Sequence, residues 1–552
     1  MRRPKRLATF ALPVATALIL ASCSGGGTEE EGGNGASNES SGQEGGSFSV
    51  STAEPEAFAP TSACYSSGCS QIISMVWTGL LQVDPETTDQ QLRMAESIES
   101  EDGQNWTIKL KDGFTFHNGE PVNAESFLRG WNYAAYGPNA TQVGFFFDKV
   151  QGYDDMQGKN PKAKTLAGVK AVDDLTIEVA LNEPFSQWPM VMSYTPAFAP
   201  MAKECEADIK ACNEMPIGNG AYQFAEKWQH NQSITLEKFA DYPDEESAGL
   251  ADEIQFKIYG DLKTAYRDFQ AGNLDIVDSV DPSQRLQAEG QYGDQILKAE
   301  SGSYSYFGFP LYDEAFQDIK MRQALSLAID RQAIIDRVLN GDYEPATGIL
   351  PGFVPGARED VCEFCEYDPE RAKQLYDEAG GLPGDRVHIW FNNDGGHEQW
   401  VQAMAQGWQQ DLGIDFEFES MPFTPYLGAL GTRSKVDGPY RLGWLPDYPS
   451  PENYLNPIYG AGSSNYGDWG GEGTGTEESH QKFLELVDQG NAAPTVEEGI
   501  PAYQAAADIV MDEMVVIPLW FGKTFILYSD NVEGVAYSPL DQILLKQVSV
   551  VS

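Results

Sequence analysis

The stretch that decides the fold runs from residue 441 to residue 456 and reads RLGWLPDYPSPENYLN. It holds one aspartate, Asp447, between the aromatic residues Trp444 and Tyr448. Its three prolines lack a backbone donor and fix φ, so they predict an irregular loop of restricted conformation rather than a helix. A carboxylate fixed in this way can meet a cationic ligand group at a low entropic cost. The alternative is an aspartate that accepts hydrogen bonds only from its own turn.

Further stretches occur in an order that is typical of one protein family. Phe116 opens an F-x-x-G-x-P-V-x-A pattern, and Arg322 opens an R-x-A-L pattern. Between them, residues 216–222 read PIGNGAY, with Asn219 where the family usually has threonine. Together with the W-x-x-D-Y order that starts at Trp444, these motifs resemble the oligopeptide/dipeptide-binding protein family of ABC importers, solute-binding protein family 5, cluster C.

The resemblance extends from about residue 48 to the C-terminus and implies an α/β fold. In that family the fold is a two-lobed clamp of the periplasmic-binding-protein type II, with an extra subdomain in the first lobe. Strands that alternate with helices favour the same class, and 552 residues are too many for one hydrophobic core. The expected first lobe comprises residues 48–78, 201–302 and 515–552, the expected subdomain Ib residues 79–200, and the expected second lobe residues 303–514.

The resemblance also implies roles for single residues in ligand binding. Asp447 matches the aspartate that pairs with the α-ammonium group of a bound peptide. Three cationic side chains resemble groups that receive the peptide's C-terminal carboxylate, and a guanidinium fork suits a carboxylate. For each of them, a solvated or purely structural role is the alternative. The expected carboxylate-binding residues are Arg441, Arg433 and His397, and the aromatic residues expected around the ligand are Tyr304, Tyr306, Trp444 and Tyr448.

Local patterns predict several single elements. Asn123 can cap a helix whose apolar residues recur at helical spacing. Residues 398–412 are predicted to form a helix, and Asp368 with Pro369 to open another helix as its cap and first residue. Pro518 lies in an apolar run near the C-terminus, where it predicts an edge strand or a crossover because it cannot donate to a sheet.

The N-terminus has the pattern of an export signal. Residues 1–22 combine a cationic start with a short apolar run, and the small residues before Cys23 resemble the lipobox of bacterial lipoproteins. In such proteins the cysteine becomes the first residue and carries the lipid, palmitate included. Residues 23–47, which are rich in Gly, Ser and Glu, are expected to form a flexible tether. An ordinary secretory signal is the alternative.

The remaining six cysteines are spaced as three local pairs. In an exported protein such pairs are expected to form disulfides that fix loops. For the C-x-x-C pair the alternatives are half of a zinc site or a redox centre, but a second C-x-x-C or a histidine pair at the required spacing is missing. The expected pairs are Cys64 with Cys69, Cys205 with Cys212, and Cys362 with Cys365.

Composition limits the partners and the chemistry. The chain has 36 basic and 83 acidic residues, a formal net charge of −47, so we expect no nucleic acid as partner. Its five histidines are scattered, and the common hydrolase and phosphate-binding motifs are missing. We therefore expect no catalytic residues, no metal site and no cofactor.

The resemblance and the N-terminal pattern together imply a receptor on the outer face of the cytoplasmic membrane, extracellular or periplasmic, held there by a lipid anchor. By the same resemblance, it is expected to be a monomer that captures short peptides between its lobes and delivers them to ABC transporter permease subunits driven by cytoplasmic ATPases. The alternatives are a non-peptide solute such as an oligosaccharide or a metal chelate, a peptide-sensing surface receptor, and a secreted hydrolase.

Overall fold

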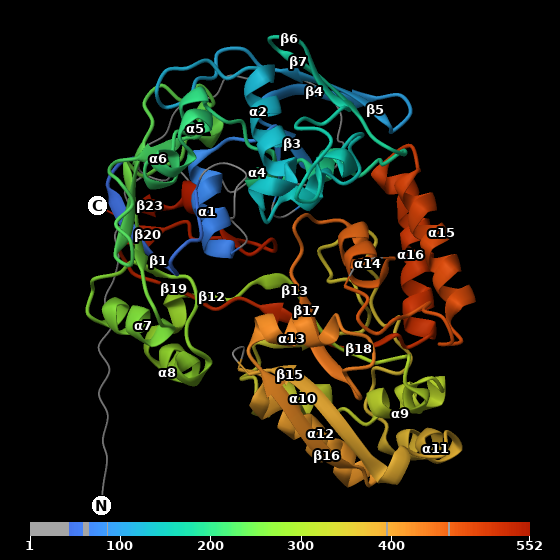
Figure 1. Cartoon of the computed structure of the whole chain (residues 1–552). Coiled ribbons are helices and arrows are strands. Elements are labelled where there is room, and N and C mark those ends of the chain that lie inside the picture. Colours follow the sequence, from blue (N-terminus) through green and yellow to red (C-terminus); the bar gives the residue numbers. More distant parts are fainter. Residues whose placement is uncertain (1–43, 59–65, 85–86, 394–395, 462–463, 552) are drawn as a thin grey trace, which may run out of the picture. The chain divides into compact units, whose positions relative to one another are not determined.

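The computed structural model describes residues 44–58, 66–84, 87–393, 396–461 and 464–551, and its elements are labelled in Figure 1. Two large mixed sheets dominate, and smaller sheets accompany the first of them. No helix of the described residues is long and apolar enough to cross a membrane. Cys23 and the predicted signal and tether up to residue 43 lie outside the described residues.

The first lobe is built on a seven-stranded sheet. Its central strand β1 runs parallel to β10 and β11, while the outer strands pair antiparallel. In spatial order the strands are β12 (Ile296–Leu297), β19 (Ile526–Tyr528), β11 (Ile276–Val277), β1 (Ser47–Thr52), β10 (Glu253–Ile258), β9 (Ser233–Lys238) and β8 (Tyr222–Phe224). The accompanying elements are α1 (Ser67–Val76), α7 (Leu262–Gln270), α8 (Pro282–Tyr292), η4 (Glu245–Ser247) and η8 (Leu545–Gln547), with the strand pairs β20 (Val532–Glu533) with β23 (Ser549–Val550) and β21 (Tyr537–Ser538) with β22 (Gln542–Ile543).

An inserted segment of the first lobe forms its own antiparallel sheet. The predicted cap at Asn123 is confirmed, because its side chain accepts a hydrogen bond from the Ser126 backbone N–H. In turn, the Ser126 hydroxyl accepts one from the Asn123 backbone N–H. The strands in spatial order are β4 (Ala95–Ser100), β5 (Asn105–Leu110), β7 (Thr176–Ala180) and β6 (Val169–Asp173). Around them are the hairpin β2 (Leu81–Val83) with β3 (Gln90–Leu92) and the helices α2 (Ala124–Ala135), α3 (Trp188–Val191), α4 (Thr195–Phe198), α5 (Lys203–Ala207) and α6 (Ile209–Glu214).

The second lobe is built on a six-stranded sheet. The predicted helix over residues 398–412 is α12, which contacts β16 (Figure 1), and Asp368 and Pro369 start α11 as predicted. In spatial order the strands are β14 (Tyr343–Pro345), β18 (Val516–Lys523), β13 (Glu300–Gly308), β17 (Tyr440–Trp444), β15 (Arg386–Asn392) and β16 (Asp415–Met421). The helices are α9 (Ile319–Leu327), α10 (Arg331–Arg337), α11 (Pro369–Glu378), α12 (Glu398–Leu412), α13 (Phe423–Leu430), α14 (Pro451–Tyr459), α15 (Glu477–Asn491) and α16 (Val496–Asp512).

Two short segments connect the two large sheets. The chain leaves the first sheet after β12 and enters the second at β13, and it returns between β18 and β19. The Thr524 backbone N–H donates to the Ala299 carbonyl over 2.9 Å, so the two connections are bonded to each other. The return lies later than the boundary expected at residue 515, because β18 pairs within the second sheet.

The prediction of an edge strand at Pro518 is wrong for the strand as a whole, because β18 is internal, between β14 and β13. Of the described strands, only β13 pairs at Pro518 itself, because β14 pairs with residues 520–522. The register shifts beside it, between Ser305 and Tyr306 of the neighbouring strand. This irregularity accommodates a residue that cannot donate to the ladder, and the Pro518 carbonyl accepts a 2.8 Å hydrogen bond from Arg331.

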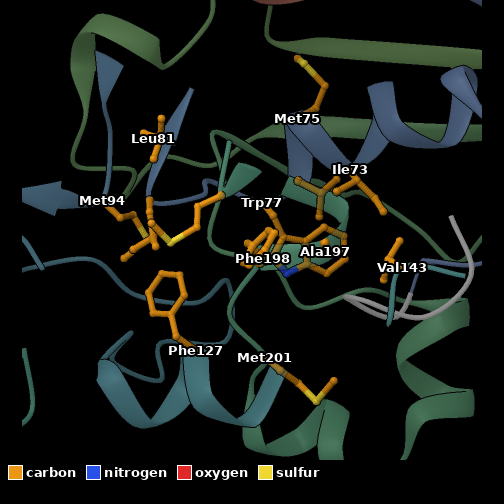
Figure 2. Packing of buried hydrophobic residues seen from close by; sticks show 14 of the residues in the cluster. Ile73, Met75, Trp77, Leu81, Met94, Phe127, Val143, Ala197, Phe198 and Met201 are labelled. Carbon is orange, nitrogen blue, oxygen red and sulfur yellow. The ribbon is translucent and has the colours of Figure 1, made fainter. Parts of the chain in front are cut away.

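Buried apolar side chains fill each lobe separately. Figure 2 shows part of the first-lobe core, where Trp77, Phe198 and Phe127 pack with several methionines. A fully buried side chain of this size contributes about 2–3 kcal/mol to folding. Met75, Trp77 and Leu81 belong to this core and also line the cavity described below, so the cavity wall is part of the packed interior.

Disulfides fix two loops of the described chain. Cys205 is bonded to Cys212, and Cys362 to Cys365, as predicted. Cys69 is also disulfide-bonded. Its predicted partner, Cys64, lies outside the described residues.

Candidate ligand-binding cavity

A cavity of about 330 Å³ lies between segments that are far apart in the sequence. Its walls come from α1 and the residues after it, from the start of α4, and from the C-terminal residues 538–547. Further first-lobe residues come from β2, from Arg93 and from the segment with Tyr242 and Ser247, and the loop between β17 and α14 adds Leu445, Pro446 and Asp447. The first lobe therefore supplies most of the wall, and the second lobe supplies the loop that carries Asp447.

Asp447 lines this cavity from an irregular loop, as the prolines predicted. Burial raises its pKa to about 6; a hydrogen bond from the Asn453 side chain opposes this, and the charge of Glu452 adds to it. Among the described residues no ion-pair partner of Asp447 is found. Asp447 is thus a partly buried acid without an ion pair in the described part of the chain.

Hydrogen bonds of the following helix hold the Asp447 loop. The Asn453 amide oxygen accepts from the Asp447 backbone N–H at 3.0 Å and from the Trp444 indole at 3.1 Å. Ser450 caps α14 and donates its hydroxyl proton to the Gln187 side chain of the first lobe at 2.9 Å. Tyr448 is buried against the first-lobe core, and its hydroxyl lies 2.6 Å from the Glu452 carboxylate. Trp444 and Tyr448 therefore support the loop and do not line the described cavity.

Tyr194 and Thr78 contribute hydroxyl groups to the cavity wall. Burial, together with the charge of Asp447, raises the pKa of Tyr194, so these two residues interact electrostatically. Thr78 is fixed by the fully buried Asn219, which accepts from the Thr78 N–H at 3.2 Å and donates to the Thr78 carbonyl at 2.9 Å. The residue that departs from the family's usual threonine thus fixes the cavity wall.

Two cations that the sequence did not single out line the same cavity. They are Arg93, between β3 and β4, and Lys546 in η8. Lys546 follows the apolar residues 543–545, and this interruption is the only signal that the sequence gives for it. With Asp447 they are the charged residues of the described cavity wall.

The other predicted site residues lie away from this cavity. Arg433 is half exposed and paired with Asp468 at 2.8 Å. Arg441 contacts Asn392 at 3.3 Å inside the second lobe, where burial lowers its pKa. His397 precedes α12 and accepts from the Trp400 indole at 3.3 Å. The remaining two residues, Tyr304 and Tyr306, are buried in the second-lobe core with ring centroids 5.3 Å apart.

Among the described residues, no group of three or more His, Cys, Asp or Glu side chains is placed to hold a metal ion.

Comparison with known proteins places this fold. The family model of the bacterial extracellular solute-binding proteins, family 5 Middle, matches residues 90–466. The oligopeptide-binding protein OppA of Bacillus subtilis is 26% identical over 548 residues, covering 96% of this chain and 97% of the relative.

Solved structures show the same architecture. The ABC transporter substrate-binding protein CtaP of Listeria monocytogenes matches with a TM-score of 0.77 at 22% identity, covering 92% of this chain and 100% of that one. Haemophilus influenzae OppA in complex with the peptide RPPGFSPFR matches with a TM-score of 0.70 at 22% identity, covering 92% and 99%. These likenesses show that the two sheets are the two lobes of the periplasmic-binding-protein fold. Since the family model spans most of its length, the chain belongs to the bacterial extracellular solute-binding proteins of family 5.

Proposed function

We propose that this protein is the extracytoplasmic receptor of an ABC importer and that it captures short peptides in the cavity around Asp447. The observation that carries the proposal is Asp447, a cavity-lining residue whose carboxylate has no ion-pair partner among the described residues. A partly desolvated carboxylate binds an ammonium group strongly, because the ligand supplies the charge that the protein lacks.

The relatives support the peptide as the class of ligand. The Bacillus subtilis relative is named an oligopeptide-binding protein, and the Haemophilus influenzae structure contains a nine-residue peptide, RPPGFSPFR. The α-ammonium group is common to all peptides with a free N-terminus, whereas side chains differ. Recognition through this group therefore fits a receptor with broad side-chain specificity.

Transport and anchoring complete the proposal. The protein binds its ligand without changing it chemically and passes it to permease subunits that cytoplasmic ATPases drive. Cys23 carries the lipid, and the residues between it and the start of the folded body near residue 45 tether that body to the outer face of the cytoplasmic membrane as a monomer. Support comes from the lipobox-like residues before Cys23 and from the polar composition of the tether.

The test is to identify the ligand that copurifies with the protein. Protein purified without denaturation is unfolded, and the released small molecules are analysed by mass spectrometry. We expect short peptides with free N-termini. Recovery of an oligosaccharide or a metal chelate, with no binding of peptides to the emptied and refolded protein in calorimetry, would contradict the proposal.

A further inference from the structure

Arg93 is a poorly compensated cation in the cavity wall. One terminal nitrogen of its guanidinium group lies 3.7 Å from the Asp244 carboxylate, which is long for an ion pair, and the other donates to Gln91 at 2.7 Å. Its Nε atom is buried and has no hydrogen-bond partner among the described residues. Asp244 is itself engaged, because it accepts a 2.7 Å hydrogen bond from Ser247.

Lys546 brings a second positive charge to the same wall. Among the described residues, the Lys546 ammonium group has no hydrogen bond and no ion pair. Lys298 and Lys523, by contrast, each pair with a carboxylate. Burial and the neighbouring charge of Arg93 lower its pKa to about 8, against the attraction of Asp244. Two cations thus share one partly engaged carboxylate.

We infer that Arg93 and Lys546 form a carboxylate-binding subsite, so that the cavity takes zwitterionic ligands with the ammonium group at Asp447 and a carboxylate at this pair. The inference is built on the proposed function and deepens it, because it names the second charged group of the ligand. Two cations that share one partly engaged carboxylate favour a bound anion beside them.

Carboxylate is the anion that this pair suits. The planar guanidinium group of arginine matches the two oxygens of a carboxylate, and the lysine ammonium adds a point charge beside it. A cavity of about 330 Å³ falls within the range of small-molecule and peptide-end sites. Two sources supply the group within a peptide, namely the C-terminus of a very short peptide or the side chain of an acidic residue near the N-terminus.

The test is calorimetry of wild type and four variants, which are Arg93→Gln, Arg93→Lys, Lys546→Gln and the control Lys170→Gln. Lys170 is exposed and pairs with Glu178 on the surface, so its loss removes one charge far from the cavity. The probes are Ala-Ala-Ala, its C-terminal amide, its N-acetyl form, and the pair Ala-Glu-Ala and Ala-Gln-Ala. Thermal unfolding shows which variants are folded. If Arg93→Gln does not fold, the test rests on Lys546→Gln and on Arg93→Lys, which keeps the positive charge.

We expect wild type to bind one carboxylate form about tenfold or more tightly than its neutral counterpart, because a charged hydrogen-bonded pair has this strength. If the C-terminal amide binds more weakly than Ala-Ala-Ala, the C-terminus supplies the carboxylate. If Ala-Gln-Ala binds more weakly than Ala-Glu-Ala, the acidic side chain supplies it. Arg93→Gln and Lys546→Gln should lose the preference for the carboxylate form of the peptide. Both variants should still bind the N-acetyl peptide more weakly than the free-amine peptide. If wild type shows the N-acetyl penalty without any carboxylate preference, the subsite is refuted while the peptide proposal stands. If no peptide binds, both fail.

Discussion

The side-chain amide oxygen of Asn453 lies 3.0 Å from the backbone nitrogen of Asp447 and accepts its hydrogen bond. The same side chain lowers the pKa of the Asp447 carboxyl group, which burial otherwise raises. Asn453 therefore positions the carboxylate through the backbone and keeps it ionised through the side chain. It acts on the ligand only through Asp447.

Asn453→Ala should weaken the binding of a free-amine peptide at pH 7 by about tenfold, because the loop loses its bonds from the Asp447 N–H and the Trp444 indole and the carboxylate loses one more. The pKa of Asp447 should rise, so the midpoint of the pH dependence of binding should move above 6. Calorimetry across pH measures both effects, with the exposed Asn182→Ala as control. An unchanged midpoint with weaker binding would show that Asn453 only supports the loop.

Binding of free-amine peptides should weaken in acid. Asp447 ionises near pH 6 in the free protein, and only the ionised form pairs with an ammonium group. A bound ammonium group lowers this pKa, so binding releases a proton and the affinity falls as the pH drops below 6. The Kd of Ala-Ala-Ala should increase about tenfold between pH 7.5 and pH 5. An N-acetylated peptide should show no such dependence, and a flat profile for both would exclude Asp447 as the titrating group.

Asp447→Asn should stabilise the ligand-free protein at pH 7. The folded-state pKa of Asp447 is about 6, above the ordinary 3.8, so the folded state loses stability as the pH rises from about 4 to 6. Removing the charge should increase the free energy of unfolding by roughly 1–3 kcal/mol at pH 7, a range that allows for the partial exposure of the side chain, and should leave it unchanged at pH 3.5. Urea unfolding at both pH values measures this, with the exposed Asp174→Asn as control. A gain that is equal at both pH values would contradict the charge explanation.

Asn219→Ala should destabilise the first lobe and weaken binding together. The change leaves the buried N–H and carbonyl of Thr78 without partners, at a cost of about 2–4 kcal/mol of unfolding free energy. Thr78 lines the cavity, so its displacement should also lower the peptide affinity. Chemical denaturation and calorimetry test this beside Gln374→Ala on α11, whose amide bonds only to a neighbouring surface carboxylate. Normal stability in Asn219→Ala would show that the wall does not depend on this side chain.

Features set by neighbours in the sequence were predictable. The cap at Asn123, the bounds of α12 and the irregular loop around Asp447 each depend on residues a few positions apart. The internal position of β18, the strand that carries Pro518, is set by β13 and β14, which lie far away in the sequence. No local pattern reports which strands will flank such a strand.

The residues of the candidate site also differ in how far the sequence predicts them. Asp447 is conspicuous among prolines and aromatic residues, whereas Arg93 and Lys546 are ordinary cations until folding brings residues more than 400 positions apart to one cavity. Burial is likewise set by the tertiary fold, so an arginine such as Arg441 cannot be assigned to a ligand or to the core from its neighbours alone.

The central claim is that the Asp447 carboxylate receives the ammonium group of a bound peptide. The most direct measurement is the ratio of Kd values for N-acetylated and free Ala-Ala-Ala in wild type, Asp447→Asn and the control Asp174→Asn. We predict a ratio of about 10 to 100 in wild type and in the control, as expected for a charged hydrogen-bonded pair, and a ratio near unity in Asp447→Asn. Equal weakening of both peptides by Asp447→Asn, with the ratio kept, would contradict the account.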